Sequence, residues 1–498
     1  KGVRGRGPPM HCNFNGKRKT FTDGFGLCSP GRWPPEARQD YYENPDLAFH
    51  HRLGTLLLDL LSKRVDIRGV AFLLASGKCA SCPFSDELLQ QGREIVFAQL
   101  KSVGCQLPVD CVAEGQPFYL CALEAILQQA GDPDALAFHS AENSFASGVR
   151  LGVNCVLPRV PAVFTAKTHW RNYDHITEQT ELRENYITAQ EHRDVVQKQF
   201  EKEASLGAMM EIGLEQAQKE WGKISVASLG ALEKADGSYR VIHDATHGLA
   251  VNSKIRVQDQ VRSPTASDVR RALQALPNAF FALKGDVSRA HRLVKVDKRD
   301  WKHLACRTGV HPDRIWLNKV GTFGVASAAY HWSRFMSGLG RAAYYLWGKL
   351  GIMQLVYVDD LLWLVGEKGG IEHVVLVIFF YVLMGLPFSW KKFAGGLMCC
   401  WVGFELELAE RVLGLSSRRA EWLSKWLHRG VEAREVRVAD LRSVLGRLSF
   451  ACSALSNFRP FLGPLFAWVS AMGKYERMKL PKLAILVMKF LSRALSGS

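Results

Sequence analysis

The stretch Leu355-Val356-Tyr357-Val358-Asp359-Asp360-Leu361-Leu362-Trp363-Leu364-Val365 places two adjacent carboxylates inside a run of apolar and aromatic residues. The apolar residues on either side predict two buried strands, with Asp359 and Asp360 at the bend between them. Two like charges that leave water cost several kcal/mol unless a cation binds them. Magnesium is the expected cation, because it prefers hard oxygen ligands and is bound together with substrate phosphates. An ordinary hairpin turn is the alternative, but Leu, Val and Trp are poor turn residues.

A second apolar run ends at an acid earlier in the chain. Residues 279–285 read as a buried strand, Asp286 ends it, and a turn is predicted next. Two metal ions that bridge substrate oxygens need acids from separate strands, and Asp286, Asp359 and Asp360 are candidates for that role. By itself, Asp286 is also explained as a helix cap or a turn acid.

A hairpin with a cationic tip is predicted in residues 226–244. Residues 226–233 and 239–244 read as strands, and Asp236-Gly237 between them is a strong turn signal. The turn brings Lys234 and Arg240 close together, where two cations are able to hold a triphosphate. An exposed hairpin with solvated charges is the alternative, and it explains this segment when the segment is taken alone.

A glycine step precedes a predicted helix. Residues 321–324 (Gly-Thr-Phe-Gly) are followed by small residues, which lets the backbone approach a flat partner closely. Tyr330, Arg334 and Arg341 are expected to add stacking and charge to this contact. Core packing of the small residues is the alternative.

Residues 416–470 have helical periodicity. Trp422 and Trp426 are four residues apart, as are Leu423 and Leu427, and these stripes are predicted to be core. Four arginines are expected to face a nucleic-acid backbone from these helices: Arg418, Arg419, Arg442 and Arg447.

Composition narrows the class of protein. The 498 residues are 47% hydrophobic, and this length suggests roughly two to four domains. Lys and Arg number 64 against 48 Asp and Glu, and the net charge of +16 favours a polyanionic partner, nucleic acid before an anionic membrane. Residues 374–388 are apolar but too few to span a bilayer, so a buried helix is predicted there. Twelve cysteines without a dense disulfide pattern, and no visible secretory signal, indicate an intracellular protein, in the nucleus or the cytoplasm.

The first half of the chain carries weaker signals. Residues 1–45 mix Arg and Lys with Gly and Pro, as in a basic flexible arm that touches phosphates or in a solvated tail. Residues 46–165 contain helix-like runs but no chemistry that assigns them a role. Residues 166–225 are predicted to be a connecting helical segment. Thr188 and Glu191 have capping-box spacing there, and they open an exposed helix.

Taken together, these segments follow one another in a recognisable order: a cationic hairpin, a strand-end Asp, a glycine-initiated helix, a Tyr-x-Asp-Asp hairpin, a Lys and a Trp-x-Gly-aromatic stretch. This order resembles the reverse transcriptases, the RNA-directed DNA polymerases of retroviruses and retroelements, over residues 226–470. Residues 322–329 (Thr-Phe-Gly-Val-Ala-Ser-Ala-Ala), 445–450 (Leu-Gly-Arg-Leu-Ser-Phe) and 459–462 (Arg-Pro-Phe-Leu) look most similar to enzymes of DIRS-like (tyrosine-recombinase) and Ty3-like elements.

The resemblance implies an α+β fold of the right-hand polymerase type. Fingers and palm, with an antiparallel palm sheet, would occupy residues 226–410. A helical thumb and the start of a connection would occupy residues 411–498. A mixed N-terminal region that matches no part of this fold would precede them.

Site residues follow from the same resemblance. The implied catalytic acids are Asp286, Asp359 and Asp360, and the implied metal ligands add Val287. Contacts to the incoming nucleotide are implied for Lys234, Arg240, His291, Phe323, Gly324 and Lys392. Contacts to primer and template are implied for Tyr357 and for Trp401, Val402, Gly403 and Phe404, which read as part of a strand-like run. His291 stands where the family usually has the Tyr or Phe that excludes a ribose 2′-hydroxyl, which leaves the choice of sugar open.

The implied function is an RNA-directed DNA polymerase of a retrotransposon. It would extend a primer 3′-hydroxyl with deoxynucleotides, using two Mg²⁺ ions, with Mn²⁺ as an alternative, and no covalent intermediate. Its partners would be an RNA template, a DNA primer and dNTPs, without a membrane. Two alternatives stay open: a catalytically inactive nucleic-acid-binding remnant of a retroelement, and an RNA-templated RNA polymerase.

Overall fold

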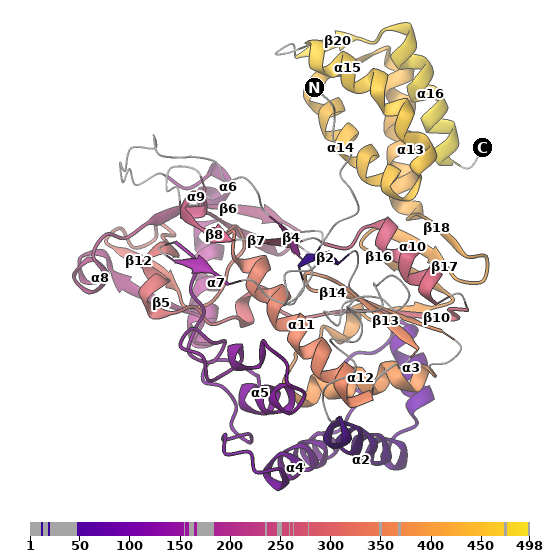
Figure 1. Cartoon of the computed structure of the whole chain (residues 1–498). Helices are drawn as coiled ribbons and strands as arrows, with labels where there is room; N and C mark the ends of the chain where they lie inside the picture. Colours follow the sequence, from indigo (N-terminus) through magenta and orange to yellow (C-terminus); the bar gives the residue numbers. More distant parts are fainter. Residues whose placement is uncertain are drawn as a thin grey trace.

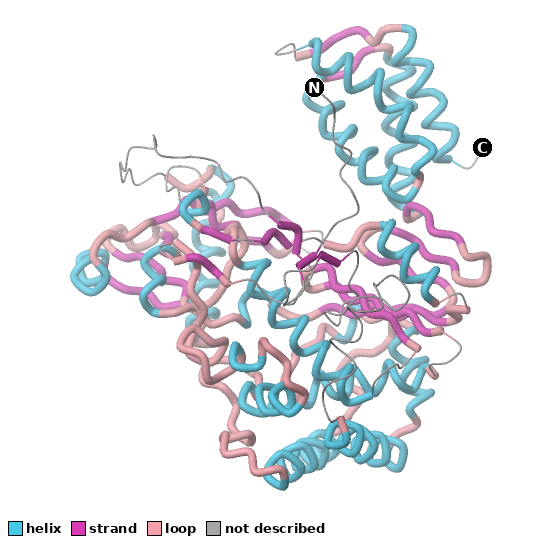
Figure 2. Tube along the Cα trace, in the orientation of Figure 1, coloured by secondary structure: helices cyan, strands magenta, loops and turns pink. Residues whose placement is uncertain are grey.

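The computed structural model describes residues 11–12, 18–19, 47–153, 155–158, 164–166, 184–234, 237–246, 251–257, 259–261, 263–276, 278–347, 351–366, 370–472 and 476–496. Helices and sheets are mixed along the chain, so the predicted α+β class is confirmed (Figures 1 and 2). The two ends of the predicted basic arm, and all but four of its residues, lie outside the described residues.

A four-stranded antiparallel sheet forms the centre of the molecule, in the order β13-β14-β10-β15. Its strands are β10 (Phe281–Asp286), β13 (Ile352–Tyr357), β14 (Asp360–Val365) and β15 (Ala394–Gly396). We call it the carboxylate sheet, because β10 ends and β14 begins at an aspartate. Leu361 to Val365 are fully buried, as the apolar pattern predicted.

Helices cover one face of the carboxylate sheet in two layers. The first contains α11 (Ala328–Trp347) and α12 (Ile371–Leu383), and α12 is buried almost all round, as predicted. The second contains α2 (Ala48–Arg64), α4 (Asp86–Ser102) and α5 (Leu120–Gln129), whereas α3 (Ile67–Ala75) contacts β10 and β15 of the sheet directly. All four share one hydrophobic core with α11 and α12 (Figure 1). The N-terminal region is therefore packed onto the centre of the molecule. Among the described residues, no helix is long and apolar enough to cross a membrane.

A five-stranded mixed sheet lies on the other side of α11, in the order β5-β12-β11-β6-β7. Its strands are β5 (Met209–Gly213), β6 (Val226–Glu233), β7 (Tyr239–Asp244), β11 (Ala305–Cys306) and β12 (Arg314–Asn318). The predicted hairpin is confirmed, because Leu232 pairs with Arg240 and Gly237 has a φ of 76°. Asp236, in the predicted turn, lies outside the described residues.

The segment before this hairpin is not only a connection. It contains α6 (Ile187–Glu191), α7 (Arg193–Ser205) and α8 (Leu214–Trp221), and it also supplies the edge strand β5. The predicted capping box is wrong: Thr188 lies inside α6, and its hydroxyl accepts a hydrogen bond from the Ala231 N–H instead. Val196 and Phe200 do share the buried face of α7.

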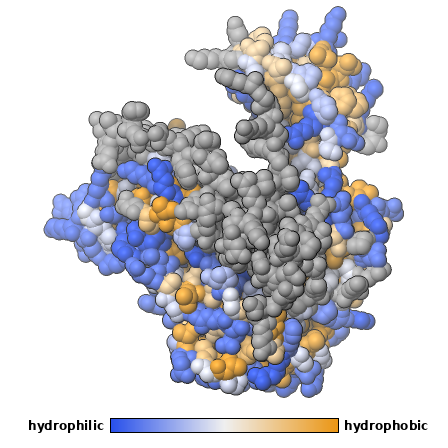
Figure 3. All heavy atoms as spheres, in the orientation of Figure 1, coloured by the Kyte–Doolittle hydropathy of each residue, from blue (hydrophilic) through white to orange (hydrophobic). Residues whose placement is uncertain are grey.

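The C-terminal part is a helical unit joined to a small sheet. The sheet has strands β16 (Met398–Trp401), β17 (Phe404–Glu407) and β18 (Val412–Leu415). The helical unit contains α13 (Ser417–Ala433), α14 (Val438–Ala454), η5 (Ser456–Phe461), α15 (Leu462–Met472) and α16 (Lys482–Ser496) around its own core. It projects at the upper right of Figure 1, and Figure 3 shows apolar side chains on its surface. Leu483, Leu486 and Phe490 of α16 are exposed.

Short elements complete the described fold. They are β1 (His11–Cys12), β2 (Arg18–Lys19), η1 (Ala135–Ala137), β3 (Val156–Leu157), β4 (Phe164–Ala166), α9 (Val251–Lys254), β8 (Arg256–Val257), β9 (Asp259–Val261), α10 (Ala266–Ala275), η2 (Ala290–Leu293), η3 (Lys298–His303), η4 (Trp390–Lys392), β19 (Glu435–Arg437) and β20 (Arg477–Lys479).

Two sequence expectations about charged and aromatic side chains are wrong. Arg334 and Arg341 do not face a flat partner, because they are buried in ion pairs with Asp134 and Asp132. Trp422 is not core: it is 40% exposed and lies under the guanidinium of Arg447. Its neighbours Leu423 and Leu427 are buried as predicted, together with Leu441, Val444, Leu445 and Leu448.

Candidate active site

The three predicted acids meet at one end of the carboxylate sheet. Asp286, the last residue of β10, is directly opposite Asp360, the first residue of β14. The N–H of Val287 donates to the carbonyl oxygen of Asp359 over 2.8 Å, which fixes the turn between β13 and β14 beside the end of β10. Residues more than 70 positions apart are thus neighbours through backbone pairing, and the side chains of all three acids interact electrostatically.

The turn that presents Asp359 is strained. Tyr357 pairs with Asp360, so Val358 and Asp359 form a two-residue hairpin loop. Val358 has a φ of 57°, a left-handed conformation that a β-branched residue rarely adopts and that costs about 1–3 kcal/mol. The indole N–H of Trp332 on α11 donates to the Val358 carbonyl oxygen over 2.6 Å and so fixes the loop to that helix. Strain of this kind persists where the surroundings over-determine it, which is common at functional sites.

Uncompensated negative charge remains on this turn. Burial raises the pKa of Asp359, and the neighbouring Asp286 raises it further. Burial, with the charges of Asp359 and Asp286, raises the pKa of Asp360 to about 6. Both shifts favour the protonated acid. A cation bound beside these carboxylates would stabilise their ionised forms and lower both pKa values.

One cation is already present. Lys392 at the end of η4 donates from Nζ to both carboxylate oxygens of Asp286, each over 2.8 Å. The segment that carries it is fixed to the same strand end: the Ser389 N–H donates to the Asp286 carbonyl oxygen, and the Ser288 N–H donates to the Pro387 carbonyl oxygen. Lys392 thus pairs with Asp286, and its expected contact with the incoming nucleotide stays a prediction.

The acids fit magnesium by their chemistry. Carboxylate oxygens are the ligands that Mg²⁺ prefers, and the pKa values of Asp359 and Asp360 stay raised although Lys392 is nearby, so one cation does not balance the three acids. Within the described parts of the chain, however, no three His, Cys, Asp or Glu side chains form a ready-made set of metal ligands. Because Mg²⁺ keeps several waters and takes substrate phosphates as ligands, a protein that supplies only one or two carboxylates is sufficient.

A cavity of about 270 Å³ connects Asp359 to the hairpin β6–β7. Lys234 and Arg240 line it from the hairpin, and Phe323 lines it from the glycine step. The guanidinium of Arg240 lies 5.6 Å from the centre of the Phe323 ring. The structure therefore brings together the predicted fingertip cations, the predicted aromatic contact and Asp359, one of the three predicted acids.

Two predicted nucleotide contacts lie behind this cavity. His291 is buried, packs edge-on against Phe323 at 5.3 Å between ring centres, and lines a separate small cavity beside α11. Burial lowers the pKa of His291, so its ring is neutral. Gly324 has a φ of 96°, and a Cβ atom there would lie 2.0 Å from the carbonyl oxygen of His243. Gly324 thus allows close packing of two backbone segments, and His291 supports Phe323 from behind.

The predicted primer contact is a turn rather than part of a strand. Trp401 pairs with Phe404, and Val402 and Gly403 form the loop between β16 and β17 with φ values of 50° and 87°. Positive φ at both positions is typical of a type I′ hairpin turn, which a strand-like interpretation misses. Trp401 and Phe404 are buried, so the exposed part of this stretch is the turn itself. Tyr357 lies behind it, with its ring 6.4 Å from the Trp401 ring.

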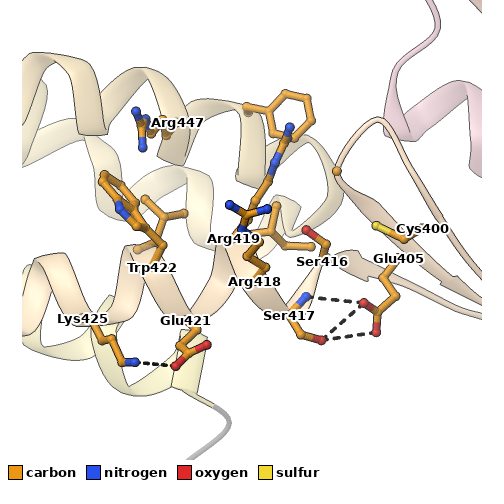
Figure 4. Close-up of a pocket in the computed structure, with 14 residues that line it drawn as sticks. Cys400, Glu405, Ser416, Ser417, Arg418, Arg419, Glu421, Trp422, Lys425 and Arg447 are labelled. Carbon is orange, nitrogen blue, oxygen red and sulfur yellow. Dashed lines mark hydrogen bonds and ion pairs between the residues drawn. The ribbon is translucent and has the colours of Figure 1, made fainter. Parts of the chain in front are cut away.

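A second, larger cavity of about 1020 Å³ lies between this turn and the helical unit. Figure 4 shows Arg418, Arg419 and Trp422 of α13 and Arg447 of α14 among the residues that line it. Arg419 lies over the Phe450 ring, Arg447 lies over the Trp422 ring, and Phe450 stacks on Phe404. Aromatic rings that carry guanidinium groups beside an open cavity suit the sugar-phosphate backbone and bases of a nucleic acid.

Sequence reasoning missed three charged residues at the first cavity. Arg289 and Arg292 line it from the segment after Asp286, and Glu203 lines it from the end of α7. The closely spaced arginines after a strand-end acid were a signal for the first two. Glu203 gave no signal, because its position depends on how α7 packs.

Comparison with solved structures finds similarity to the foamy viral protease-reverse transcriptase. Its complex with double-stranded DNA has 17% sequence identity and a TM-score of 0.47, over 67% of this chain and 63% of that chain. Its complex with an RNA/DNA hybrid has 16% identity and a TM-score of 0.46, over 66% of this chain and 40% of that chain. The chain thus spans less than two thirds of the length of these structures. No protein-family model and no curated protein matches the chain.

Proposed function

We propose that this protein is an RNA-directed DNA polymerase of a DIRS-like or Ty3-like retrotransposon, which extends a primer 3′-hydroxyl with deoxynucleotides. The observation that carries the proposal is the juxtaposition of Asp286, Asp359 and Asp360 with a cavity that Lys234 and Arg240 line. Acids that could bind Mg²⁺ stand next to cations that could bind phosphates, which is what nucleotidyl transfer requires.

Each residue has a defined task in this proposal. Lys234 and Arg240 would bind the phosphates of the incoming nucleotide, and Phe323 would pack against its base pair. Asp286, Asp359 and Asp360 would hold two Mg²⁺ ions, with the Val287 backbone alongside. The bound ions would neutralise the phosphates and activate the primer hydroxyl. Lys392 would move from Asp286 to the leaving pyrophosphate when that carboxylate gains another cation.

Nucleic acid would lie between the sheet end and the helical unit. The turn Val402-Gly403 would contact the primer, and the arginines of the second cavity would contact the backbone without reading sequence. The excess of 64 basic over 48 acidic residues supports such a partner.

The test is primer extension on an RNA template with dNTPs and Mg²⁺. We expect extension that a chelator abolishes and that Asp359→Asn abolishes. The matched control is Asp110→Asn, which changes an exposed, ion-paired aspartate far from the sheet end and should leave extension unchanged. A folded wild-type chain that binds a primer–template duplex but never extends it would refute the polymerase proposal and support the inactive remnant.

Competition between deoxynucleotides and ribonucleotides tests the sugar preference. His291 lies behind Phe323 and does not line the cavity, so we propose that Phe323 and the backbone near it discriminate the sugar. Preferential incorporation of ribonucleotides would favour the RNA-templated RNA polymerase instead.

A further inference from the structure

Arg289 is placed unusually for a residue in the segment after a catalytic acid. It follows Asp286 by three positions and has a φ of 62°, a left-handed conformation that turns the chain sharply at the end of β10. Its side chain lines the cavity that also contains Lys234, Arg240 and Asp359. With 38% of its side chain exposed, Arg289 is accessible to a ligand in that cavity.

Glu203 at the end of α7 is the acid that holds Arg289. The Arg289 Nη2 donates to Glu203 Oε2 over 2.7 Å. The same oxygen accepts from Nε and Nη2 of Arg292, over 3.0 and 2.8 Å. Burial alone would raise the pKa of Glu203, but Arg292 and Arg289 outweigh burial and lower it, so Glu203 is ionised. One carboxylate therefore serves two guanidinium groups.

The two arginines are not equivalent. Arg292 is 13% exposed, donates twice to Glu203 and donates once more to Asn318 Oδ1 over 2.5 Å. Arg289 has one hydrogen bond to Glu203 and is three times as exposed. If Arg289 leaves, Glu203 keeps its stronger partner, and no carboxylate is left without a counter-ion. Moving the Arg289 side chain from Glu203 to another anion therefore costs little free energy.

The cavity carries more positive than negative charge. Its lining includes the cations Lys234, Arg240, Arg289 and Arg292, against the carboxylates Glu203 and Asp359. Both hairpin cations, Lys234 and Arg240, line the cavity without a lining carboxylate from the hairpin, whereas Arg289 and Arg292 share the single carboxylate of Glu203. Arg289 is the cation near the end of β10 that could turn toward a polyphosphate with a bidentate fork.

We propose that Arg289 is a third phosphate-binding residue, which exchanges Glu203 for the polyphosphate tail of the incoming nucleotide. Glu203 holds Arg289 in place before the nucleotide arrives and remains paired with Arg292 afterwards. The inference rests on the proposed function, because it assigns the polyphosphate site of the same cavity. It adds a lining residue from the segment after β10 to the two that the hairpin supplies.

The test measures binding of inorganic tripolyphosphate by calorimetry, with Mg²⁺ present, and primer extension in parallel. We expect Arg289→Ala to weaken tripolyphosphate binding about tenfold, the loss of one charge-assisted hydrogen bond, and to raise KM for dNTPs similarly with little change in kcat. Glu203→Gln should act in the opposite direction and tighten binding about threefold, because it removes the competing charge. Arg307→Ala is the matched control, since it breaks a comparable ion pair with Glu184 outside the cavity and should change neither quantity.

The direction of the Glu203 variant separates this role from a structural one. If the Glu203–Arg289 pair only stabilises the fold, both variants weaken binding and lower the melting temperature together, and the proposal is wrong. Arg289→Gln serves if Arg289→Ala does not fold, with the same expected loss of binding. Unchanged tripolyphosphate affinity in a folded Arg289 variant also overturns the inference, whether or not primers are extended. Arg289-dependent binding by a chain that does not extend primers would instead overturn the proposed function and leave the phosphate site standing.

Discussion

Two clusters of aspartates in this molecule, one buried and one partly buried, treat their charge in opposite ways. Between α5 and α11, Asp132 accepts hydrogen bonds from Arg341 and Tyr345, and Asp134 accepts from Arg334. At the end of the carboxylate sheet, Asp359 and Asp360 face each other's charge and that of Asp286, with Lys392 on Asp286 only. The first region is neutralised by the fold, whereas the second keeps excess negative charge.

The difference separates a structural site from a candidate functional one. Arg341 is completely buried, and its pairing with Asp132 fastens the N-terminal region onto α11. The two arginines balance the two aspartates, so the paired cluster has no net charge for a ligand to neutralise. At the end of the carboxylate sheet, Asp359 and Asp360 have raised pKa values and the turn at Val358 is strained, which is the pattern expected where a ligand binds. Four variants test this contrast, in order of decreasing expected effect.

The largest effect is expected for Asp359→Asn on catalysis. Loss of one ligand of the proposed ions should lower kcat by about three orders of magnitude, equivalent to about 4 kcal/mol in the barrier. Stability should not fall, because the variant removes an uncompensated charge. Primer extension and urea unfolding measure the two quantities. Full activity in Asp359→Asn would contradict the assignment of this turn to catalysis.

Asp132→Ala should lower stability and leave catalysis unchanged, the reverse of Asp359→Asn. It leaves the buried guanidinium of Arg341 without its main partner, which is expected to lower the free energy of unfolding by about 3 kcal/mol. Activity at a temperature where the variant is folded should be retained. Urea unfolding at pH 7 gives the stability, and the double variant Asp132→Leu with Arg341→Met should recover most of it. A loss as small as that of Asp110→Ala, at an exposed pair, would show that the cluster is not structural.

Asp360→Asn should stabilise the protein in a pH-dependent way. The folded protein holds the pKa of Asp360 at about 6, above the ordinary 3.8, so folding is penalised as pH rises through this interval and remains penalised above it. The full shift would correspond to about 3 kcal/mol, and partial solvent exposure reduces this to about 1 kcal/mol. Thermal melting without divalent ions should therefore show Asp360→Asn above wild type at pH 8 and equal to it at pH 4. An equal gain at both pH values would show that charge is not its cause.

The smallest effect is expected for Val358→Gly. Glycine relieves the left-handed strain but loses apolar contacts and costs more chain entropy, so stability should change by only about 0.5 kcal/mol. Val356→Gly, in regular β13, has no strain to relieve and should cost about 2 kcal/mol. Urea unfolding of both variants tests the contrast. Equal losses would mean that the turn at Val358 stores no strain.

Much of the fold around the candidate site could be predicted from local sequence. Apolar periodicity located the hairpin of β13 and β14, the strand that ends at Asp286 and the buried helix α12. These elements depend on side chains that are near one another in the chain. The turn at Val402-Gly403 was missed because an apolar run concealed its type I′ conformation.

By itself, the sequence thus determined which strand ends carry Asp286 and Asp360 and which hairpin loop carries Asp359, because hydrophobic burial dictates where each strand ends. Only the tertiary structure decided which charges are neutralised. Arg341 meets Asp132 across 209 positions, and Arg289 meets Glu203 across 86, because helices far apart in the chain pack side by side. Charge compensation depends on distances of a few ångströms in space, and no local pattern encodes them.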